Sequence, residues 1–121
     1  MKALLLIAHG SRREQSNQEV LTLVDNLKKT TLTGYDIYQA GFLEIAKPSI
    51  LGAIEHCVDK GASSVVLLPY FLNSGNHVVQ DIPDIIHQAK LKYPGLDIQV
   101  TTHIGASNLM MDLIVSLAKA H

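Results

Sequence analysis

The chain has 121 residues, of which 47% are hydrophobic and 17% are charged, and its formal net charge is −1. The apolar fraction excludes an intrinsically disordered chain, and we expect residues 1–121 to form a single domain. The near-zero charge provides no field that would attract nucleic acid or an anionic membrane. The single cysteine excludes an internal disulfide framework and a paired-cysteine metal site.

The longest apolar runs, at residues 3–8 and 65–72, are too short to form a membrane span. A spanning helix needs about 20 apolar residues, and a signal peptide has a longer apolar region than residues 3–8 provide. We therefore expect a soluble cytoplasmic protein with no membrane or nucleic-acid partner.

Short apolar segments alternate with helical patterns in the first half of the chain. Residues 2–8 form a continuous apolar run, which is typical of a strand buried on both faces. The next apolar residues recur at the spacing of an amphipathic helix, and they are Val20, Leu21, Val24 and Leu27. Residues 35–40 predict a second strand, and Pro48-Ser49 begins a second helix that ends at Lys60-Gly61.

The second half repeats this alternation. Residues 64–69 predict a third buried strand, residues 70–76 a long connection, and residues 96–101 a fourth strand. The intervening helix would direct inward Val78, Ile82, Ile85, Ile86 and Ala89. The last helix would present an apolar face made of Leu109, Met110, Leu113, Ile114 and Leu117, with Met110 in the core and Met111 on the surface.

Four strand–helix units in succession predict an α/β three-layer sandwich, with a four-stranded parallel sheet of order 2-1-3-4 and helices on both faces. The carboxyl ends of parallel strands share one edge, and ligands bind there where the strand order reverses. Polar residues follow each predicted strand: His9, Gly10, Ser11 and Arg12, then Glu44, then residues 70–77, then His103. With this order His9 and His77 flank the reversal point, whereas His103 either lines the cleft or only borders it.

Histidine nitrogens together with a carboxylate suit a borderline divalent metal ion such as cobalt, nickel, iron or zinc. A neutral histidine can also accept a proton near physiological pH. Gly10 and Gly75 would let the backbone approach a ligand, Ser11 is the predicted cap of the first helix, and Arg12 would bind carboxylates. The other histidines, which are His56, His87 and His121, are predicted to be solvated, and Cys57 to be a small buried hydrophobe.

At these positions the sequence resembles the short-form sirohydrochlorin cobaltochelatases, which belong to the class II, ATP-independent tetrapyrrole chelatases. The matching segments follow the same order along the whole chain and are residues 5–12, 42–44 with Pro48, 68–77 with 81–83, and 104–106. The most specific segment runs from Phe71-Leu72 through His77 to Asp81-Ile82-Pro83.

The resemblance implies that His9 and His77 bind the metal ion and that His9 also accepts a proton. Glu44 matches an acidic position of the family and is the candidate third ligand or proton acceptor. Lys47 stands at a substrate-contact position that is acidic in some relatives, and as a lysine it could pair with a macrocycle carboxylate. The implied substrate-binding residues are Ser11, Arg12, Lys47, Leu72, Asn73, Ser74, Gly75, Asn76 and His77.

The implied activity is insertion of a divalent metal ion, Co²⁺ in the first instance, into sirohydrochlorin in cobalamin or tetrapyrrole biosynthesis. The metal is a substrate, no cofactor is required, and ATP is not used, in keeping with the absence of a G-x-x-x-x-G-K-[ST] phosphate loop. Many class II chelatases place the macrocycle between two lobes of this architecture. The resemblance therefore implies that this chain, as one lobe, forms a homodimer.

Three alternatives compete with this interpretation. The same site could insert Ni²⁺ or Fe²⁺, because metal selectivity depends on geometry and supply. The same ligands could serve a non-catalytic metal or tetrapyrrole carrier. A phosphohistidine enzyme also has histidine and glycine after a strand, but that chemistry needs an arginine where this chain has Ala8.

Overall fold

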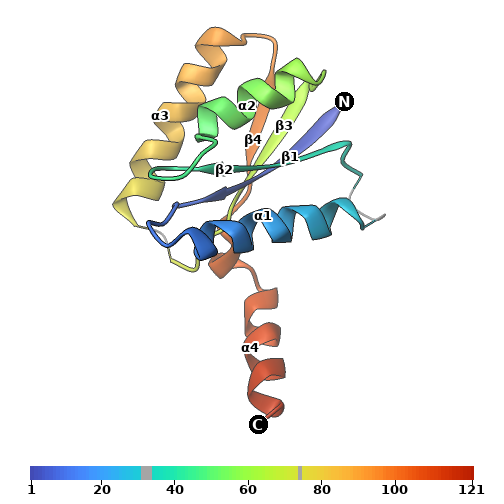
Figure 1. Cartoon of the computed structure of the whole chain (residues 1–121), viewed down its shortest axis with the longest axis vertical. Coiled ribbons are helices and arrows are strands. Elements are labelled where there is room, and N and C mark those ends of the chain that lie inside the picture. The colour runs from blue at the N-terminus through green and yellow to red at the C-terminus, as the bar shows by residue number, and fades with distance from the viewer. Residues whose placement is uncertain (31–33, 74) are drawn as a thin grey trace.

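The computed structural model contains a parallel sheet of four strands in the order β2-β1-β3-β4 (Figure 1). It describes residues 1–30, 34–73 and 75–121, without the side chains of residues 76–79. The elements are β1 (Lys2–Ala8), α1 (Glu14–Lys28), β2 (Ile37–Phe42), α2 (Ile50–Asp59), β3 (Ser64–Pro69), α3 (Asn76–Lys92), β4 (Asp97–Val100), the short 3-10 helix η1 (Ile104–Ala106) and α4 (Leu109–Lys119). The predicted class, strand number and strand order are confirmed.

Alternating side chains of the central strand separate two apolar cores. Ala3, Leu5 and Ile7 of β1 belong to the larger core, which also contains Ile50 and Ile54 of α2 and Ile82 and Ala89 of α3. Leu6 and Ala8 belong to the smaller core, with Val20 and Val24 of α1. Accordingly, α1 covers one face of the sheet, and α2 and α3 cover the other (Figure 1).

Most boundaries follow the sequence signals. Strands β1 and β3 have the predicted bounds, whereas β2 lies two residues later than predicted and β4 is shorter at both ends. Helix α2 begins after Ser49, whose side chain accepts a hydrogen bond from the backbone N–H of Gly52 at 3.0 Å. In α3, Ile82 and Ala89 are buried and Ile85 and Ile86 partly buried, as predicted, while the side chain of Val78 lies outside the described residues.

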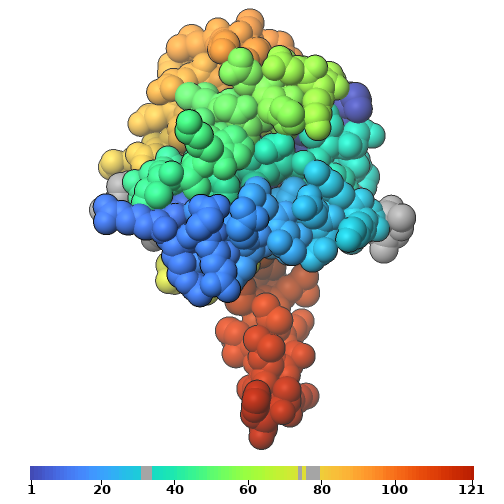
Figure 2. Space-filling model, viewed as in Figure 1, coloured from blue at the N-terminus to red at the C-terminus, as the bar shows by residue number. Residues whose placement is uncertain are grey.

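Helix α4 corrects one expectation. It projects away from the sheet and lies against neither face (Figures 1 and 2), and none of its residues is buried. Met110, predicted to lie in the core, is only partly buried, while Met111 is exposed as predicted. An amphipathic pattern shows that a helix has a face to bury, but it does not show which surface covers that face.

Within the described part of the chain, no helix is long and apolar enough to span a membrane.

Candidate functional site

The carboxyl ends of β1, β2 and β3 lie side by side and form the candidate site. In the sheet register Ala8 pairs with Phe42, and Ile7 pairs with Pro69. The pairing continues past the strands, because the N–H of Leu43 donates to the carbonyl of Ala8 at 2.9 Å and the N–H of Tyr70 donates to the carbonyl of Ile7 at 2.7 Å. The three connections that leave these strands therefore start from one edge of the sheet.

The loops that carry His9 and Glu44 are joined through their backbones. The N–H of Glu44 donates to the carbonyl of His9 at 3.0 Å. Gly10 has a φ of 89°, and a β-carbon at this position would overlap the carbonyl oxygen of Glu44. The side chains of His9 and Glu44 are both exposed at this edge. The predicted association of these two residues is thus present at the level of the backbone.

A strained turn follows Glu44, and sequence reasoning did not anticipate it. The carbonyl of Glu44 accepts the N–H of Ala46 at 2.7 Å, and Ile45 between them has a φ of 69°. Positive φ is costly for a β-branched residue, and such strain concentrates at functional sites. The turn is followed by exposed Lys47 and by a cis peptide bond between Lys47 and Pro48. No feature of the sequence indicates this turn, because isoleucine normally avoids this conformation.

A second residue that was missed, Asn17, holds the loop after β1. Its side chain accepts from the N–H of Ser11 at 2.9 Å and donates to the carbonyl of Ser11 at 2.8 Å, and it is only 4% exposed. The signal was present, because an asparagine stands on the same helical face as Val20 and Val24. A buried amide needs polar partners, and the loop supplies them.

Ser11 does not cap α1, contrary to the prediction. The residue at the N-cap position is Arg13, which makes no side-chain cap, and the hydroxyl of Ser11 accepts the N–H of Arg13 at 3.0 Å before the helix begins. The loop simply extends two residues further than expected. Arg12 is exposed at this edge, while the guanidinium of Arg13 donates to Gln15 at 2.8 Å.

The connection between β3 and α3 is anchored beside η1. The N–H of Gly105 donates to the carbonyl of Phe71 at 3.0 Å, and a side chain at Gly105 would overlap the carbonyl of Leu72. Leu72, Asn73 and Gly75 are exposed. Ser74 lies outside the described residues, and Asn76 and His77 form the first turn of α3 with side chains outside the described set.

The ring of His9 packs against the ring of Phe71, with the centroids 4.3 Å apart and the planes inclined by 47°. His103 is partly exposed and precedes η1, and the hydrogen bonds of the described residues do not link it to His9. Among the residues with described side chains, no group of three His, Cys, Asp or Glu could hold a metal ion. Because the side chain of His77 is not in that set, the ligand set of His9, His77 and Glu44 remains a prediction.

The remaining histidines and the cysteine follow their predictions. His56, His87 and His121 are exposed. Cys57 is fully buried, and its burial raises the pKa of the thiol to about 11, although the nearby charge of Lys60 acts in the opposite direction. At neutral pH the thiol is therefore protonated and shielded, which excludes a nucleophilic or ligand role.

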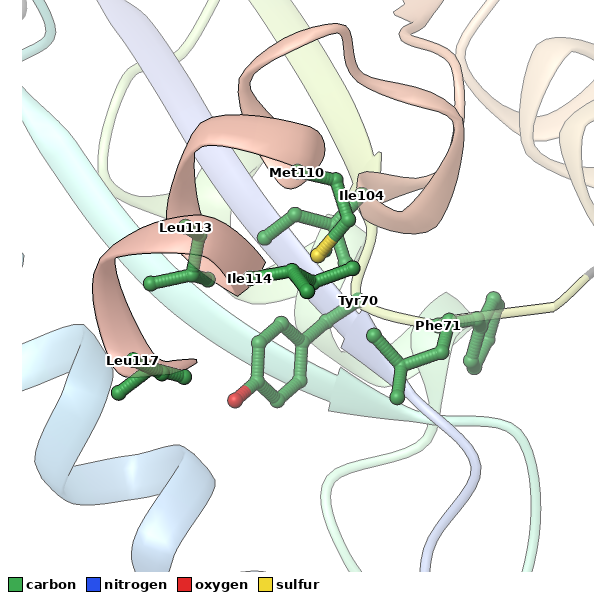
Figure 3. Close-up of a pocket in the computed structure, with 8 residues that line it drawn as sticks. Tyr70, Phe71, Ile104, Met110, Leu113, Ile114 and Leu117 are labelled. Carbon is green, nitrogen blue, oxygen red and sulfur yellow. The ribbon is translucent and has the colours of Figure 1, made fainter. Parts of the chain in front are cut away.

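An apolar cavity of about 490 Å³ separates α4 from the site edge. Its walls include Met110, Leu113, Ile114 and Leu117 of α4, and Figure 3 shows these side chains on the side of the helix that faces Tyr70 and Ile104. Leu72, from the connection after β3, also lines it. The cavity therefore adjoins the predicted substrate-binding segment.

Comparison with known proteins agrees with this architecture. A family model described as CbiX matches residues 3–120. A chloroplastic sirohydrochlorin ferrochelatase of Arabidopsis thaliana is 36% identical over 92% of this chain and 48% of its own length. A sirohydrochlorin cobaltochelatase of Methanococcus maripaludis is 38% identical over 71% of this chain and 58% of its own length. The chain thus spans about half the length of the curated relatives that it matches.

Solved structures give the same fold. A cobalamin biosynthesis CbiX protein from Marinobacter aquaeolei superimposes with a TM-score of 0.83 at 21% identity, covering 99% of this chain and 96% of that chain. The sirohydrochlorin chelatase SirB from Bacillus subtilis subspecies spizizenii, in complex with cobalt, gives a TM-score of 0.85 at 28% identity, covering 98% of this chain and 50% of that one.

Proposed function

The chain belongs to the CbiX family, and from this premise we propose that it is a sirohydrochlorin chelatase that inserts a divalent metal ion, Co²⁺ in the first instance, into the macrocycle. The observation that carries the proposal is the exposure of His9 and Glu44 on backbone-linked loops at the edge from which α3 also starts. The curated relatives described above act on this same macrocycle, according to their names.

The chemistry of insertion fits these side chains. A divalent ion enters the ring as two pyrrole N–H protons leave, so a proton acceptor must stand over the ring, and the ligands must release the ion. A neutral imidazole can bind the ion and can accept a proton. We assign these roles to His9, with His77 as the second ligand and Glu44 as the third ligand or the proton acceptor.

We propose that the acetate and propionate groups of the macrocycle bind exposed cations and the connection after β3. Arg12 offers a guanidinium with no protein partner among the described interactions, and Lys47 is exposed directly after the strained turn. Ser11 and residues 72–77, which contain Leu72, Asn73, Ser74, Gly75, Asn76 and His77, would complete this surface. His103, which directly precedes η1, would line or border this surface.

We further propose that the reaction uses no ATP and takes place in the cytoplasm. Metal insertion into a macrocycle that already holds four nitrogen ligands is favourable without nucleotide hydrolysis, and the single buried cysteine suits a reducing compartment. Ni²⁺ and Fe²⁺ are the alternative substrates, and a carrier that binds without turning over is the alternative function.

The decisive assay follows the absorbance of sirohydrochlorin with purified protein and Co²⁺, Ni²⁺ or Fe²⁺, under anaerobic conditions and without nucleotide. We expect insertion faster than in the protein-free control, with Co²⁺ giving the highest kcat/KM. A rate equal to the control for all three ions, with stoichiometric binding of the macrocycle, would identify a carrier instead.

We also propose that the functional unit is a homodimer in which a second copy covers α4. Its side chains include several large hydrophobic groups, and the solvent-exposed fractions are 71% for Leu109, 51% for Leu113, 56% for Ile114 and 63% for Leu117. An isolated helix shorter than about 12 residues is marginal in water, so α4 needs an apolar surface to stay folded. Burying one leucine contributes about 1.5–3 kcal/mol, and several leucines together would offset the free-energy cost of association.

The choice of a second copy as the partner is supported by the position of the apolar face of α4. The apolar face of α4 adjoins Leu72 and Tyr70, so a partner seated there would stand next to the site edge. A second copy would thus supply the other wall of the cleft.

Charges on the apolar face of α4 should abolish the dimer. We expect the wild-type chain to sediment at twice its mass of 13.2 kDa, and the Leu113→Lys/Leu117→Lys variant to sediment as a monomer with little insertion activity. The matched control is Asp112→Lys/Ser116→Lys, on the polar side of the same helix, which should stay dimeric. A wild-type monomer with full activity would contradict the proposal.

A further inference from the structure

Phe71 connects the apolar core to the candidate metal ligand His9. It directly follows Tyr70 after β3, is only 4% exposed and belongs to the larger core. Its ring lies 4.3 Å from the ring of His9, centroid to centroid, in a tilted arrangement. Such aromatic pairs stabilise a structure beyond the effect of the area they bury. A rigid core side chain therefore supports an exposed functional one.

Among the residues that the structure describes, no hydrogen bond provides this support. Within the described part of the chain, neither ring nitrogen of His9 has a hydrogen-bond partner, so both nitrogens are open toward the described surroundings. Metal-binding histidines usually donate their second N–H to a carboxylate or carbonyl, which fixes the orientation of the ring. At His9, the packing of the imidazole against the ring of Phe71 limits its rotation instead.

Backbone hydrogen bonds hold the chain both just before Phe71 and at Phe71 itself. The N–H of Tyr70 donates to the carbonyl of Ile7 at 2.7 Å, which joins this segment to the strand that leads into His9. The carbonyl of Phe71 accepts the N–H of Gly105 at 3.0 Å, and Gly105 packs so closely on Leu72 that no β-carbon would fit. The ring of Phe71 is thus fixed relative to β1 and η1.

We propose that Phe71 is a positioning residue, whose ring orients the imidazole of His9 so that one nitrogen can bind the incoming metal ion while the other remains unblocked. Its catalytic consequence rests on the proposed chelatase function, but the orientation of the ring does not. A histidine held by packing rather than by a second hydrogen bond can bind and release an ion without rearranging a hydrogen-bonded partner. That property suits a metal ion that must be passed on.

The test compares Phe71→Leu, which removes the ring, with Phe71→Tyr, which keeps it. By NMR, ring-current effects of Phe71 should shift the His9 ring protons away from those of exposed His56 in the wild type. The shift should vanish in Phe71→Leu and persist in Phe71→Tyr. We expect kcat and the Co²⁺ affinity of the free protein to fall about tenfold in Phe71→Leu, with the KM for sirohydrochlorin unchanged and both losses restored in Phe71→Tyr.

Ile54→Val provides the control for lost core packing, since Ile54 lies in the same core on α2. It should lower stability without moving the His9 resonances or kcat. Unchanged His9 resonances or unchanged Co²⁺ affinity in Phe71→Leu would overturn the proposal, and so would an equal fall of kcat in Ile54→Val. A wild type that binds Co²⁺ without inserting it would refute the chelatase function, and the resonances and affinities would then still decide the role of Phe71.

Discussion

Replacing His9 with alanine should lower the rate of metal insertion by about 100-fold or more and leave the fold intact. The size follows from the two roles assigned to this residue, since loss of a general base alone typically costs 10²–10⁴-fold. The side chain is exposed, so its removal leaves no cavity in the core. Turnover should be measured from the absorbance of sirohydrochlorin with Co²⁺, and folding by circular dichroism. His77→Ala should give a loss of similar size, because it would remove the proposed second ligand.

Matched controls exist on the helices. His56→Ala and His87→Ala remove imidazoles that are also solvent-exposed but lie on α2 and α3 away from the first turn. Both variants should turn over at close to the wild-type rate. If His9→Ala kept near-normal turnover, this residue would have no part in the mechanism, and a loss in the helical variants would show that the choice of strand-end histidines is wrong.

Replacing Gly10 with alanine should affect both stability and turnover. An L-residue at a φ of 89° is strained by about 1–2 kcal/mol, and the new β-carbon would also push on the carbonyl oxygen of Glu44. We therefore expect a loss of about 2–4 kcal/mol in the free energy of unfolding. The displaced loop carries Glu44 away from His9, and a displacement of about 1 Å can cost 10²-fold in rate. Denaturant unfolding and the insertion assay measure the two effects.

Substitutions at two other glycines distinguish the effect of backbone strain from the effect of the contact with Glu44. Gly34 has a φ of 73°, and no residue that the structure describes lies within 4 Å of a β-carbon placed there, so Gly34→Ala should show the backbone strain alone and keep full turnover. Gly95 has no positive φ, and within the described ranges nothing lies within 4 Å of a β-carbon placed there, so Gly95→Ala should be nearly neutral. A Gly10→Ala variant no worse than Gly34→Ala would show that the two site loops move independently.

The sequence predicted what depends on burial and on strand topology. Continuous apolar runs such as those at 2–8 and 64–69 are typical of strands that are covered on both faces. The structure places β1 and β3 at those bounds. From a parallel sheet of order β2-β1-β3-β4 it follows that residues after these strands share an edge. His9 and Glu44 could therefore be associated although they are far apart in the chain.

Features set by tertiary contacts were not predictable. The positive φ of Ile45 opposes the preference of its side chain, and only the hydrogen bonds around Glu44 account for it. The contact of Phe71 with His9 depends on how a core ring meets a loop, which no periodicity encodes. The isolation of α4 was missed for another reason, since its apolar face looks the same whether this chain or another one covers it.

The position of β1 at the centre of the sheet has a consequence for the order in which the protein is built during synthesis. Strand β1 pairs with β2 on one side and with β3 on the other, so it cannot be fully paired until residues 64–69 have been synthesised. The edge that carries His9, Glu44 and the start of α3 receives its last backbone support later still, because the carbonyl of Phe71 accepts the N–H of Gly105 in η1. Most of the chain must therefore be synthesised before the candidate site edge has all of these backbone supports, and the apolar residues of α4 follow directly after it.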